Sequence, residues 1–280
     1  MFGANGQLAS DLIPRLAASG WGVIKANRRV CDISILPDVG SFLSRNIPDM
    51  VINCTAYHKL DACEKNRFDA VHINAVAPAA IAHWCDINGA KFIHFSTDYV
   101  FGHDSGFCGQ ISELDQPRPL QTYGKSKYIG EQMIQNICDN SCIIRTSSLF
   151  GKAGSSGKGG NFVETMLKKI RANEPIEVVG DVIMSPTSTI DLSDAIVKLL
   201  EHDPRGIYHI TNDYECSWYD FACAIRDISN IGGTVSPVTL ESRNEPFARP
   251  RYSSLSCGKI NSLGITMRPW IDALEEYLCS

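Results

Sequence analysis

The chain has 280 residues, of which 44% are hydrophobic and 20% are charged, which is ordinary for a globular protein large enough for one α/β core and a smaller lobe. A net charge of -5 excludes a strongly basic surface, and no apolar run approaches the roughly 20 residues of a membrane span, so neither nucleic acid nor membrane is an expected partner. The eleven cysteines are scattered, and neither they nor the seven histidines show metal-ligand spacing. We therefore expect reduced thiols, no metal site and a cytoplasmic location.

Short apolar runs alternate with longer helical patterns along the chain. Val- and Ile-rich runs with little alternation, typical of strands buried on both faces, predict strands at 22–26, 50–54, 91–96, 142–146, 176–179 and 206–210. Helical patterns lie at about 6–19, 67–87, 122–138, 161–173, 189–202 and 217–229, and a last helix begins near Pro269. The alternation predicts a doubly wound, mostly parallel α/β sheet of the Rossmann type, with a smaller α+β lobe.

The predicted domains divide near residue 150. Residues 1–150 form the expected dinucleotide-binding domain, whereas residues 151–280 mainly form a substrate-binding lobe, with residues from about 174 to 210 returning to the core. The stretch GKAGSSGKGG at 151–160 has the composition of a flexible segment and marks the passage between the two parts.

The chain opens with MFGANGQLA, in which Gly3, Gly6 and Ala9 lie three residues apart. Gly3 permits a tight turn, and Gly6 lets the backbone approach a pyrophosphate. Ala9 allows the following helix to pack closely, with its positive N-terminus facing the phosphates. The pattern predicts a dinucleotide site; taken alone, it also fits an ordinary glycine-containing turn before a helix.

Only Met1 and Phe2 precede this loop, although a dinucleotide loop normally follows a buried strand. That strand normally lies in the centre of the sheet, between 22–26 and 50–54. Its loss removes about four or five buried side chains, each worth roughly 1.5–3 kcal/mol. We therefore expect that the usual first strand is lacking in this sequence and that the natural protein begins a few residues upstream; the alternative is a truncated, less stable relative.

The stretch ANRRVCDIS follows the predicted strand at 22–26. A cofactor without a 2′-phosphate usually meets an acidic residue at this point, but Arg28 and Arg29 stand there instead. Because two guanidinium groups suit a 2′-phosphate, the sequence favours NADPH, with NADH as the alternative. Asp32 and Ile33 are then placed to frame the adenine. Two solvated surface arginines are the other interpretation of this stretch.

A catalytic pattern lies in TYGKSKYIGEQ, where Tyr123 and Lys127 are four residues apart at the start of a predicted helix and therefore share a face. A phenol with a pKa of about 10 is a poor proton donor near neutrality, and a neighbouring ammonium lowers this pKa. The run KFIHFSTDYVFG places Thr97 at the carboxyl end of a buried strand, where an open α/β sheet carries its chemistry. We expect Tyr123 to protonate a substrate carbonyl that Thr97 binds.

These motifs together indicate a known family. The glycine loop, STDYVF at 96–101, SELDQPRPLQTYGKSK at 112–127 and IIRTSSLFG at 143–151 resemble an extended short-chain dehydrogenase/reductase. The later segments VVGDVIMSPTSTIDLSDAI, GIYHITN, ARPRYSSLS and PWIDALEEYL resemble the dTDP-4-dehydrorhamnose reductase family, and the similarity covers nearly the whole chain. The resemblance implies hydride transfer from a nicotinamide cofactor to the C4 keto carbon of a nucleotide-linked deoxysugar. Because extended members often pair through helices, a homodimer is the assembly it favours.

The resemblance also implies a role for each matching position. The implied cofactor contacts are Gly3, Asn5, Gly6, Gln7 and Leu8 at the phosphates, Asp32 and Ile33 at the adenine, and Ala56 and Tyr57 of the TAY segment beside the ribose. Tyr123 is implied as the proton donor, with Lys127 as its partner and ribose anchor. Thr97 and Asp98 are the implied contacts of the substrate carbonyl, and the second lobe is implied to hold the nucleotide half of the substrate.

Three positions depart from the family pattern. Ser148 stands where the family usually has a tryptophan that flanks the sugar, which removes an apolar face worth roughly 1–3 kcal/mol. Val182 and Met184 stand in place of a glutamine and a glycine, so a polar contact of the second lobe is missing. The family also resembles the regulatory subunit of methionine adenosyltransferase. A non-catalytic, nucleotide-binding regulatory protein is therefore the alternative function, and a reductase of a different carbonyl is a third.

Overall fold

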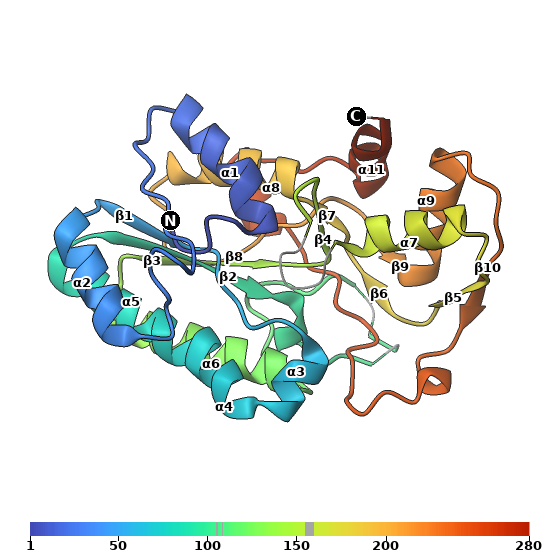
Figure 1. Ribbon diagram of the computed structural model, residues 1–280, viewed down its shortest axis with the longest axis horizontal. Helices are drawn as coiled ribbons and strands as arrows, with labels where there is room; N and C mark the ends of the chain where they lie inside the picture. Colours follow the sequence, from blue (N-terminus) through green and yellow to red (C-terminus); the bar gives the residue numbers. More distant parts are fainter. Residues whose placement is uncertain (105, 108, 155–159, 280) are drawn as a thin grey trace.

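The computed structural model describes residues 1–104, 106–107, 109–154 and 160–279. Its centre is a four-stranded parallel sheet in the order β1-β2-β3-β8 (Figure 1). These strands are β1 (Met50–Asn53), β2 (Lys91–Thr97), β3 (Ser141–Thr146) and β8 (Gly206–His209). Each coincides with a predicted run, so the predicted α/β fold with a mostly parallel sheet is confirmed.

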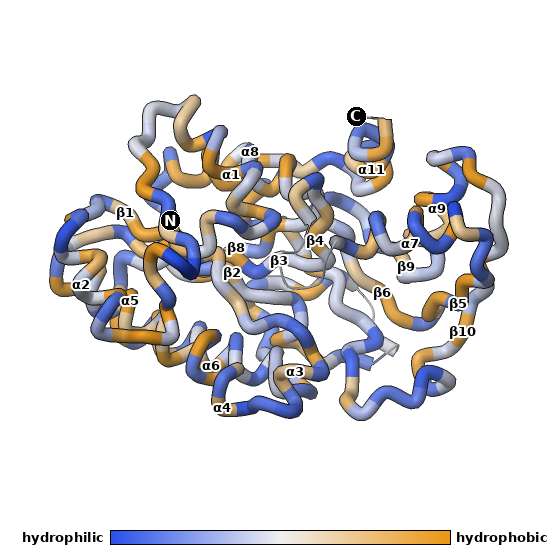
Figure 2. Tube along the Cα trace, viewed as in Figure 1, coloured by the Kyte–Doolittle hydropathy of each residue, from blue (hydrophilic) through white to orange (hydrophobic). Residues whose placement is uncertain are grey.

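Helices cover both faces of this sheet (Figure 1). One face carries α1 (Gln7–Ala18) and α8 (Thr189–Leu200), and the other carries α2 (Leu36–Asn46), α5 (Ala77–Asn88) and α6 (Thr122–Ile137). Successive strand residues alternate between the two apolar cores: Ile93 packs in the core under α1 and α8, whereas Phe92 packs in the core under α2 and α5. In Figure 2 these helices carry both hydrophobic and hydrophilic residues, as expected for helices that bury one face. Burial on both sides explains why the strand sequences are apolar with little alternation.

The N-terminal residues enter the sheet beside β1, where the first strand of such a fold is expected. Phe2 forms parallel bridges to both Ala26 and Asn53, and its backbone N–H donates to the carbonyl of Ile52 at 2.9 Å. The predicted strand at 22–26 is wrong, because only Ala26 of that run is bridged. A strand persists only where its neighbour offers a continuous row of partners, and on this side Phe2 provides a single bridged residue.

The lobe is built around an apolar core of its own, which includes Phe150, Phe221 and Leu274. Its main helices are α7 (Phe162–Arg171), α9 (Trp218–Ile228) and α11 (Trp270–Cys279), and its edge is the parallel pair β5 (Ile176–Val179) and β10 (Val235–Val238) (Figure 1). The predicted strand at 176–179 therefore lies in the lobe and not in the central sheet. Glu177 is exposed between buried neighbours, which is typical of a strand with one covered face. Of the residues from about 174 to 210, which we expected to return to the first domain, α8 packs on the central sheet and β8 belongs to it.

The remaining elements are short. They are α3 (Leu60–Lys65), α4 (Arg67–Val71), η1 (His72–Val76), η2 (Asp98–Val100), β4 (Leu149–Phe150), β6 (Ile183–Met184), β7 (Thr187–Ser188), β9 (Cys216–Ser217), η3 (Glu241–Arg243) and α10 (Gly258–Asn261). The predicted helix at 67–87 is a run of α4, the π-helical turn η1 and α5. Of the stretch predicted to be flexible at 151–160, residues 155–159 lie outside the described residues. Within the described ranges, no helix combines the length and apolar composition that crossing a bilayer requires.

Close packing of α6 against η1 depends on a glycine. A Cβ on Gly130 would lie 2.2 Å from the carbonyl oxygen of Asn74, so Gly130→Ala is expected to lower the free energy of unfolding by about 1–3 kcal/mol. Gly40 in α2 is the matched control, because a Cβ there meets nothing within 4 Å. Gly40→Ala is expected to raise the free energy of unfolding by about 0.5–1 kcal/mol. Urea unfolding of both variants measures this difference, and equal effects at the two positions would contradict the packing described.

Candidate functional site

A cavity of about 1390 Å³ opens at the carboxyl ends of β1, β2 and β3, between the central sheet and the lobe. All residues predicted for the cofactor, the substrate and catalysis line it, namely Gly3, Asn5, Gly6, Gln7, Leu8, Arg28, Arg29, Asp32, Ile33, Ala56, Tyr57, Thr97, Asp98, Tyr123 and Lys127. Ser148 lines it as well, whereas Val182 and Met184 do not and are buried in the lobe. The predicted site residues, which span positions 3 to 127 of the chain, therefore share one cavity.

The glycine loop presents a bare helix N-terminus to this cavity. Helix α1 begins after Gly6, which gives its backbone N–H groups no side-chain cap. Gly3 has a φ of 73°, and a Cβ there would lie 3.0 Å from the carbonyl carbon of Cys54, so only glycine fits without strain. Free N–H groups at the positive end of a helix bind phosphate groups. The loop therefore fits the pyrophosphate of a dinucleotide cofactor.

Arg28 and Arg29 also line this cavity, and Arg28 forms an ion pair with Asp32. The guanidinium of Arg28 donates from Nε to Asp32 Oδ2 at 2.8 Å, and Ser34 donates to Asp32 Oδ1 from both its N–H, at 3.0 Å, and its hydroxyl, at 2.8 Å. Burial of Asp32 opposes ionisation, but these hydrogen bonds outweigh it and lower the pKa of Asp32. Asp32 is thus a charged anchor that orients Arg28 at the cavity wall.

Asn74, which the sequence analysis missed, holds the TAY segment in place. Its Oδ1 accepts from the backbone N–H of Tyr57 at 2.8 Å, and its Nδ2 donates to the carbonyl of Tyr57 at 2.9 Å and to the hydroxyl of Ser126 at 3.0 Å. Asn74 belongs to the π-helical turn η1, and such turns occur often at functional sites. A helix pattern in the sequence carries no signal for a π turn, which explains why this residue was not found.

Tyr123 lies in the first turn of α6, against the turn that follows β2. A Cβ on Gly124 would lie 2.1 Å from the carbonyl oxygen of Tyr99, so a glycine is needed for this approach. Burial raises the pKa of Tyr123, and a hydrogen bond with Thr97 only partly opposes this effect. The direction is the reverse of the one expected from a neighbouring ammonium, because burial disfavours the phenolate. A protonated phenol at neutral pH is the form that donates a proton.

Asp98 has a buried carboxyl that accepts hydrogen bonds from three hydroxyl groups. Ser253 and Ser147 donate to Oδ2 at 2.6 and 2.9 Å, and Thr97 donates to Oδ1 at 3.0 Å. Burial raises the pKa of Asp98 to about 6, although the three hydrogen bonds lower it. Asp98 therefore fixes the hydroxyl of Thr97 beside Tyr123. Ser147 and Ser253 were not predicted, and the separation of Ser253 from Asp98 in the chain leaves no local signal for the contact.

Lys127 is buried on α6 one turn after Tyr123, and its Nζ forms a hydrogen bond with a histidine of the sheet. Its Nζ lies 2.9 Å from Nε2 of His94. Burial lowers the pKa of Lys127 to about 7, and the charge of Glu131 partly opposes this. Two further cavity hydroxyls, those of Ser96 and Thr146, are buried and have no hydrogen-bond partner within the described part of the chain. Such hydroxyls offer donors and acceptors to a bound molecule.

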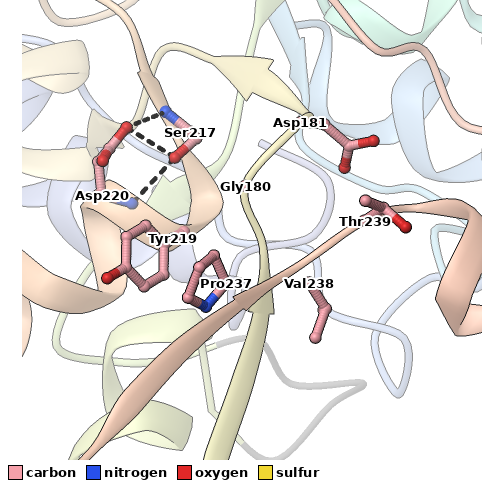
Figure 3. A pocket seen from close by; sticks show the side chains of 8 residues that line it. All are labelled: Gly180, Asp181, Ser217, Tyr219, Asp220, Pro237, Val238 and Thr239. Carbon is pink, nitrogen blue, oxygen red and sulfur yellow. Dashed lines mark hydrogen bonds between the residues drawn. The ribbon is translucent and has the colours of Figure 1, made fainter.

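A second, smaller hollow of about 430 Å³ lies in the lobe at the β5–β10 edge (Figure 3). Its polar groups already serve the fold. Ser217 and Asp220 form a reciprocal cap at the start of α9. Asp181 accepts from the backbone N–H of Leu240 at 2.7 Å and pairs with Arg251 at 2.8 Å. The candidate site is therefore the large cavity.

Comparison with known proteins identifies the family. A family model described as RmlD substrate binding domain matches residues 1–280. The chain is 40% identical over 277 residues to the spore coat polysaccharide biosynthesis protein SpsK of Bacillus subtilis, a match that covers 99% of this chain and 95% of that protein. It is 31% identical over 277 residues to a dTDP-4-keto-6-deoxy-D-glucose reductase of Streptomyces niveus, a match that covers 98% of this chain and 94% of that protein. A crystal structure of dTDP-4-dehydrorhamnose reductase from Bacillus anthracis in complex with NADP matches with a TM-score of 0.92 and 35% identity, covering 99% of this chain and 97% of that one. The chain belongs to the dTDP-4-dehydrorhamnose reductase family.

Membership of this family confirms the resemblance and the predicted oxidoreductase class. The NADP complex of the Bacillus anthracis enzyme agrees with the preference for NADPH that Arg28 and Arg29 indicated. Ser148, where the sequence resemblance led us to expect a tryptophan, has a φ of 47° and lies at the cavity wall. The departure at Val182 and Met184 falls outside the cavity lining, so only the one at Ser148 changes the surface that a ligand meets there.

Proposed function

We propose that this protein reduces the C4 keto group of a nucleotide-linked deoxysugar with NADPH. The observation that carries the proposal is the junction of Tyr123, Thr97 and Asp98 in the same cavity as the uncapped glycine loop. A carbonyl reductase needs a protonated acid beside the carbonyl oxygen and a dinucleotide site within reach of the carbonyl carbon. The Tyr123 phenol and the α1 N-terminus meet these two needs.

The residues present fit NADPH. Gly3, Gly6 and the N-terminus of α1 hold the pyrophosphate, Arg28 and Arg29 hold the 2′-phosphate, and Asp32 and Ile33 flank the adenine. The hydroxyls of Ser96 and Thr146 are free to bind the polar groups of the nicotinamide half. When bound, the reduced nicotinamide supplies the hydride.

The chain's own groups orient the carbonyl and move the proton. Thr97 donates its one hydroxyl proton to Asp98 and would turn it to the carbonyl oxygen of the bound substrate, and Tyr123 donates its phenolic proton to that oxygen as the carbon is reduced. Lys127 anchors the cofactor ribose and returns a proton to the phenolate. The lobe, which reaches the cavity through Phe162 and Trp218, holds the nucleotide half of the substrate. With Ser148 in place of a tryptophan, the wall beside the sugar is smaller and more polar.

Consumption of NADPH with a panel of dTDP-linked 4-keto-6-deoxysugars tests this proposal. We expect turnover with at least one member and conversion of its keto group to an alcohol. Turnover only with carbonyl compounds outside the panel would replace the proposed substrate class. No turnover at all, together with full biological effect of a Tyr123→Phe variant, would favour a regulatory protein like the subunit of methionine adenosyltransferase.

The two arginines predict the cofactor preference. Removing both in Arg28→Ala/Arg29→Ala is expected to raise the KM for NADPH about 10–100-fold, because charge-assisted hydrogen bonds contribute about 1.5–3 kcal/mol. The KM for NADH should change little, since NADH has no 2′-phosphate. Arg226→Ala is the matched control, because Arg226 lies on α9 outside the cavity. An equal rise in the KM for NADPH and for NADH would show that the two arginines do not recognise the 2′-phosphate.

A further inference from the structure

The central sheet buries a histidine whose position no part of the proposed reaction requires. His94 on β2 is 0% exposed and lies between Lys127 of α6 and Asn53 of the neighbouring strand β1. The register of the sheet places Asn53 directly beside His94. Asn53 is also 0% exposed. The three side chains form one buried row that ends at Lys127 in the cavity.

The hydrogen bonds of Asn53 determine which nitrogen of His94 carries the proton. Asn53 Oδ1 accepts from the backbone N–H of Thr55 at 3.1 Å and from its hydroxyl at 2.6 Å. The amide Nδ2 of Asn53 therefore faces His94, and its N–H donates to Nδ1 at 3.3 Å. Because a neutral imidazole has one acceptor and one donor, Nε2 carries the ring proton. Burial, aided by the charge of Lys127, keeps the pKa of His94 well below its ordinary value, so the ring is neutral.

This tautomer is complementary to an amine and not to an ammonium. The Nε2–H of His94 points at Nζ of Lys127 over 2.9 Å. An unprotonated amine accepts this hydrogen bond with its lone pair, whereas an ammonium has only donors and would face another donor. A buried donor opposite a donor is costly, because neither group finds a partner.

Among the residues that the structure describes, the charged groups around Lys127 leave its ammonium without a counter-ion of its own. Glu131 lies one turn further on α6, but Arg145 of β3 holds both of its oxygens, at 3.0 and 2.6 Å. The carboxyl of Asp98 on η2 already accepts hydrogen bonds from three hydroxyls. Tyr123 of α6 stays protonated because burial raises the pKa of its phenol. The Lys127 pKa of about 7 is consistent with this arrangement.

We propose that Asn53 and His94 are positioning residues which favour the unprotonated amine of Lys127 and thereby set the upper pH limit of the reduction. The inference rests on the proposed function. Reduction consumes one proton: the phenol of Tyr123 gives its proton to the carbonyl oxygen, the Lys127 ammonium returns one to the phenolate, and solvent reprotonates the amine. Reduction therefore slows as pH rises through the titration of Lys127.

Two substitutions in the row of Asn53, His94 and Lys127 are designed to favour the ammonium of Lys127 over the amine. In His94→Gln, the side-chain carbonyl oxygen accepts a hydrogen bond from the ammonium. In Asn53→Asp, the carboxylate accepts from Nδ1–H of His94, so that Nε2 becomes an acceptor for the ammonium. Both variants should move the high-pH limb of the kcat profile upward by about one unit or more. His202→Gln, an exposed histidine outside the cavity, is the matched control and should leave the limb in place.

The experiment measures the titration of Lys127 directly and without substrate. Nζ of lysine labelled with ¹⁵N is followed by NMR from pH 5 to 11, and the Lys127 signal is assigned by its loss in Lys127→Arg. We expect a midpoint near 7 in the unaltered protein, in line with the pKa of Lys127, and a higher midpoint in the folded variants. A midpoint above about 9 in the unaltered protein overturns the inference without any variant, since it is close to that of a free lysine. An unchanged midpoint in the folded variants overturns it as well. Because this titration needs no turnover, failure of the proposed reaction remains distinguishable from failure of the inference.

Discussion

Tyr123→Phe is expected to lower kcat for keto-sugar reduction by about 10²–10⁴-fold, the usual contribution of a positioned general acid. The substitution removes the phenolic O–H but keeps the aromatic ring. The contact of this ring with the ring of Tyr99, with centroids 6.2 Å apart, is therefore retained. NADPH binding should therefore change much less than kcat. Steady-state kinetics together with NADPH fluorescence titration measure both quantities.

Tyr128→Phe is the matched control for this substitution. Tyr128 lies on the same helix and packs in an apolar cluster outside the cavity, so its hydroxyl has no part in the proposed chemistry. Its replacement should leave kcat within about twofold, as expected for a change away from the reacting atoms. Equal kcat values for the two variants would contradict the role proposed for Tyr123.

Arg145→Met is expected to lower the free energy of unfolding by about 3–5 kcal/mol. Arg145 and Glu131 have side chains that are 2% and 0% exposed, and they form a bidentate ion pair between β3 and α6. Without the guanidinium, the carboxylate of Glu131 is left buried and without its main partner. Urea unfolding measures the change.

The double substitution Arg145→Met/Glu131→Leu separates the cost of an unpaired charge from the loss of packing. Replacing both partners of a buried pair by apolar residues is often close to neutral. The double variant should therefore be more stable than Arg145→Met alone. If Arg145→Met alone lowers the free energy of unfolding by less than about 1 kcal/mol, the pair contributes no more than a weak surface ion pair. That result would contradict the role of its burial.

Local sequence patterns predicted most of the core and the residues that line the cavity. The runs at 50–54, 91–96 and 142–146 became β1, β2 and β3, because strands covered on both faces must be apolar throughout. Thr97 and Tyr123 were found because each follows a regular pattern, the end of a buried strand or the start of a helix. Such signals are short in sequence and survive without knowledge of the neighbours.

Features that depend on distant neighbours were not predicted. The run at 176–179 has a strand composition but pairs with β10 of the lobe, and no local signal names a strand's partner. The contact of Ser253 with Asp98 joins residues 155 positions apart. The row from Asn53 through His94 to Lys127 requires the register of β1 and β2 and the packing of α6 on them. The predicted effect of Lys127 on Tyr123 failed for the same reason, because burial of the phenol is a tertiary property.

Isotope transfer tests the central claim, which is that hydride passes from NADPH to the carbonyl carbon of a nucleotide-linked keto sugar held beside Tyr123. The protein is incubated with a dTDP-linked 4-keto-6-deoxysugar and NADPH carrying deuterium at the transferable position of the nicotinamide. We expect mass spectrometry and NMR to show one deuterium bound to C4 of the product sugar. A product without carbon-bound deuterium, or an unaltered keto sugar beside unoxidised NADPH, would contradict the account.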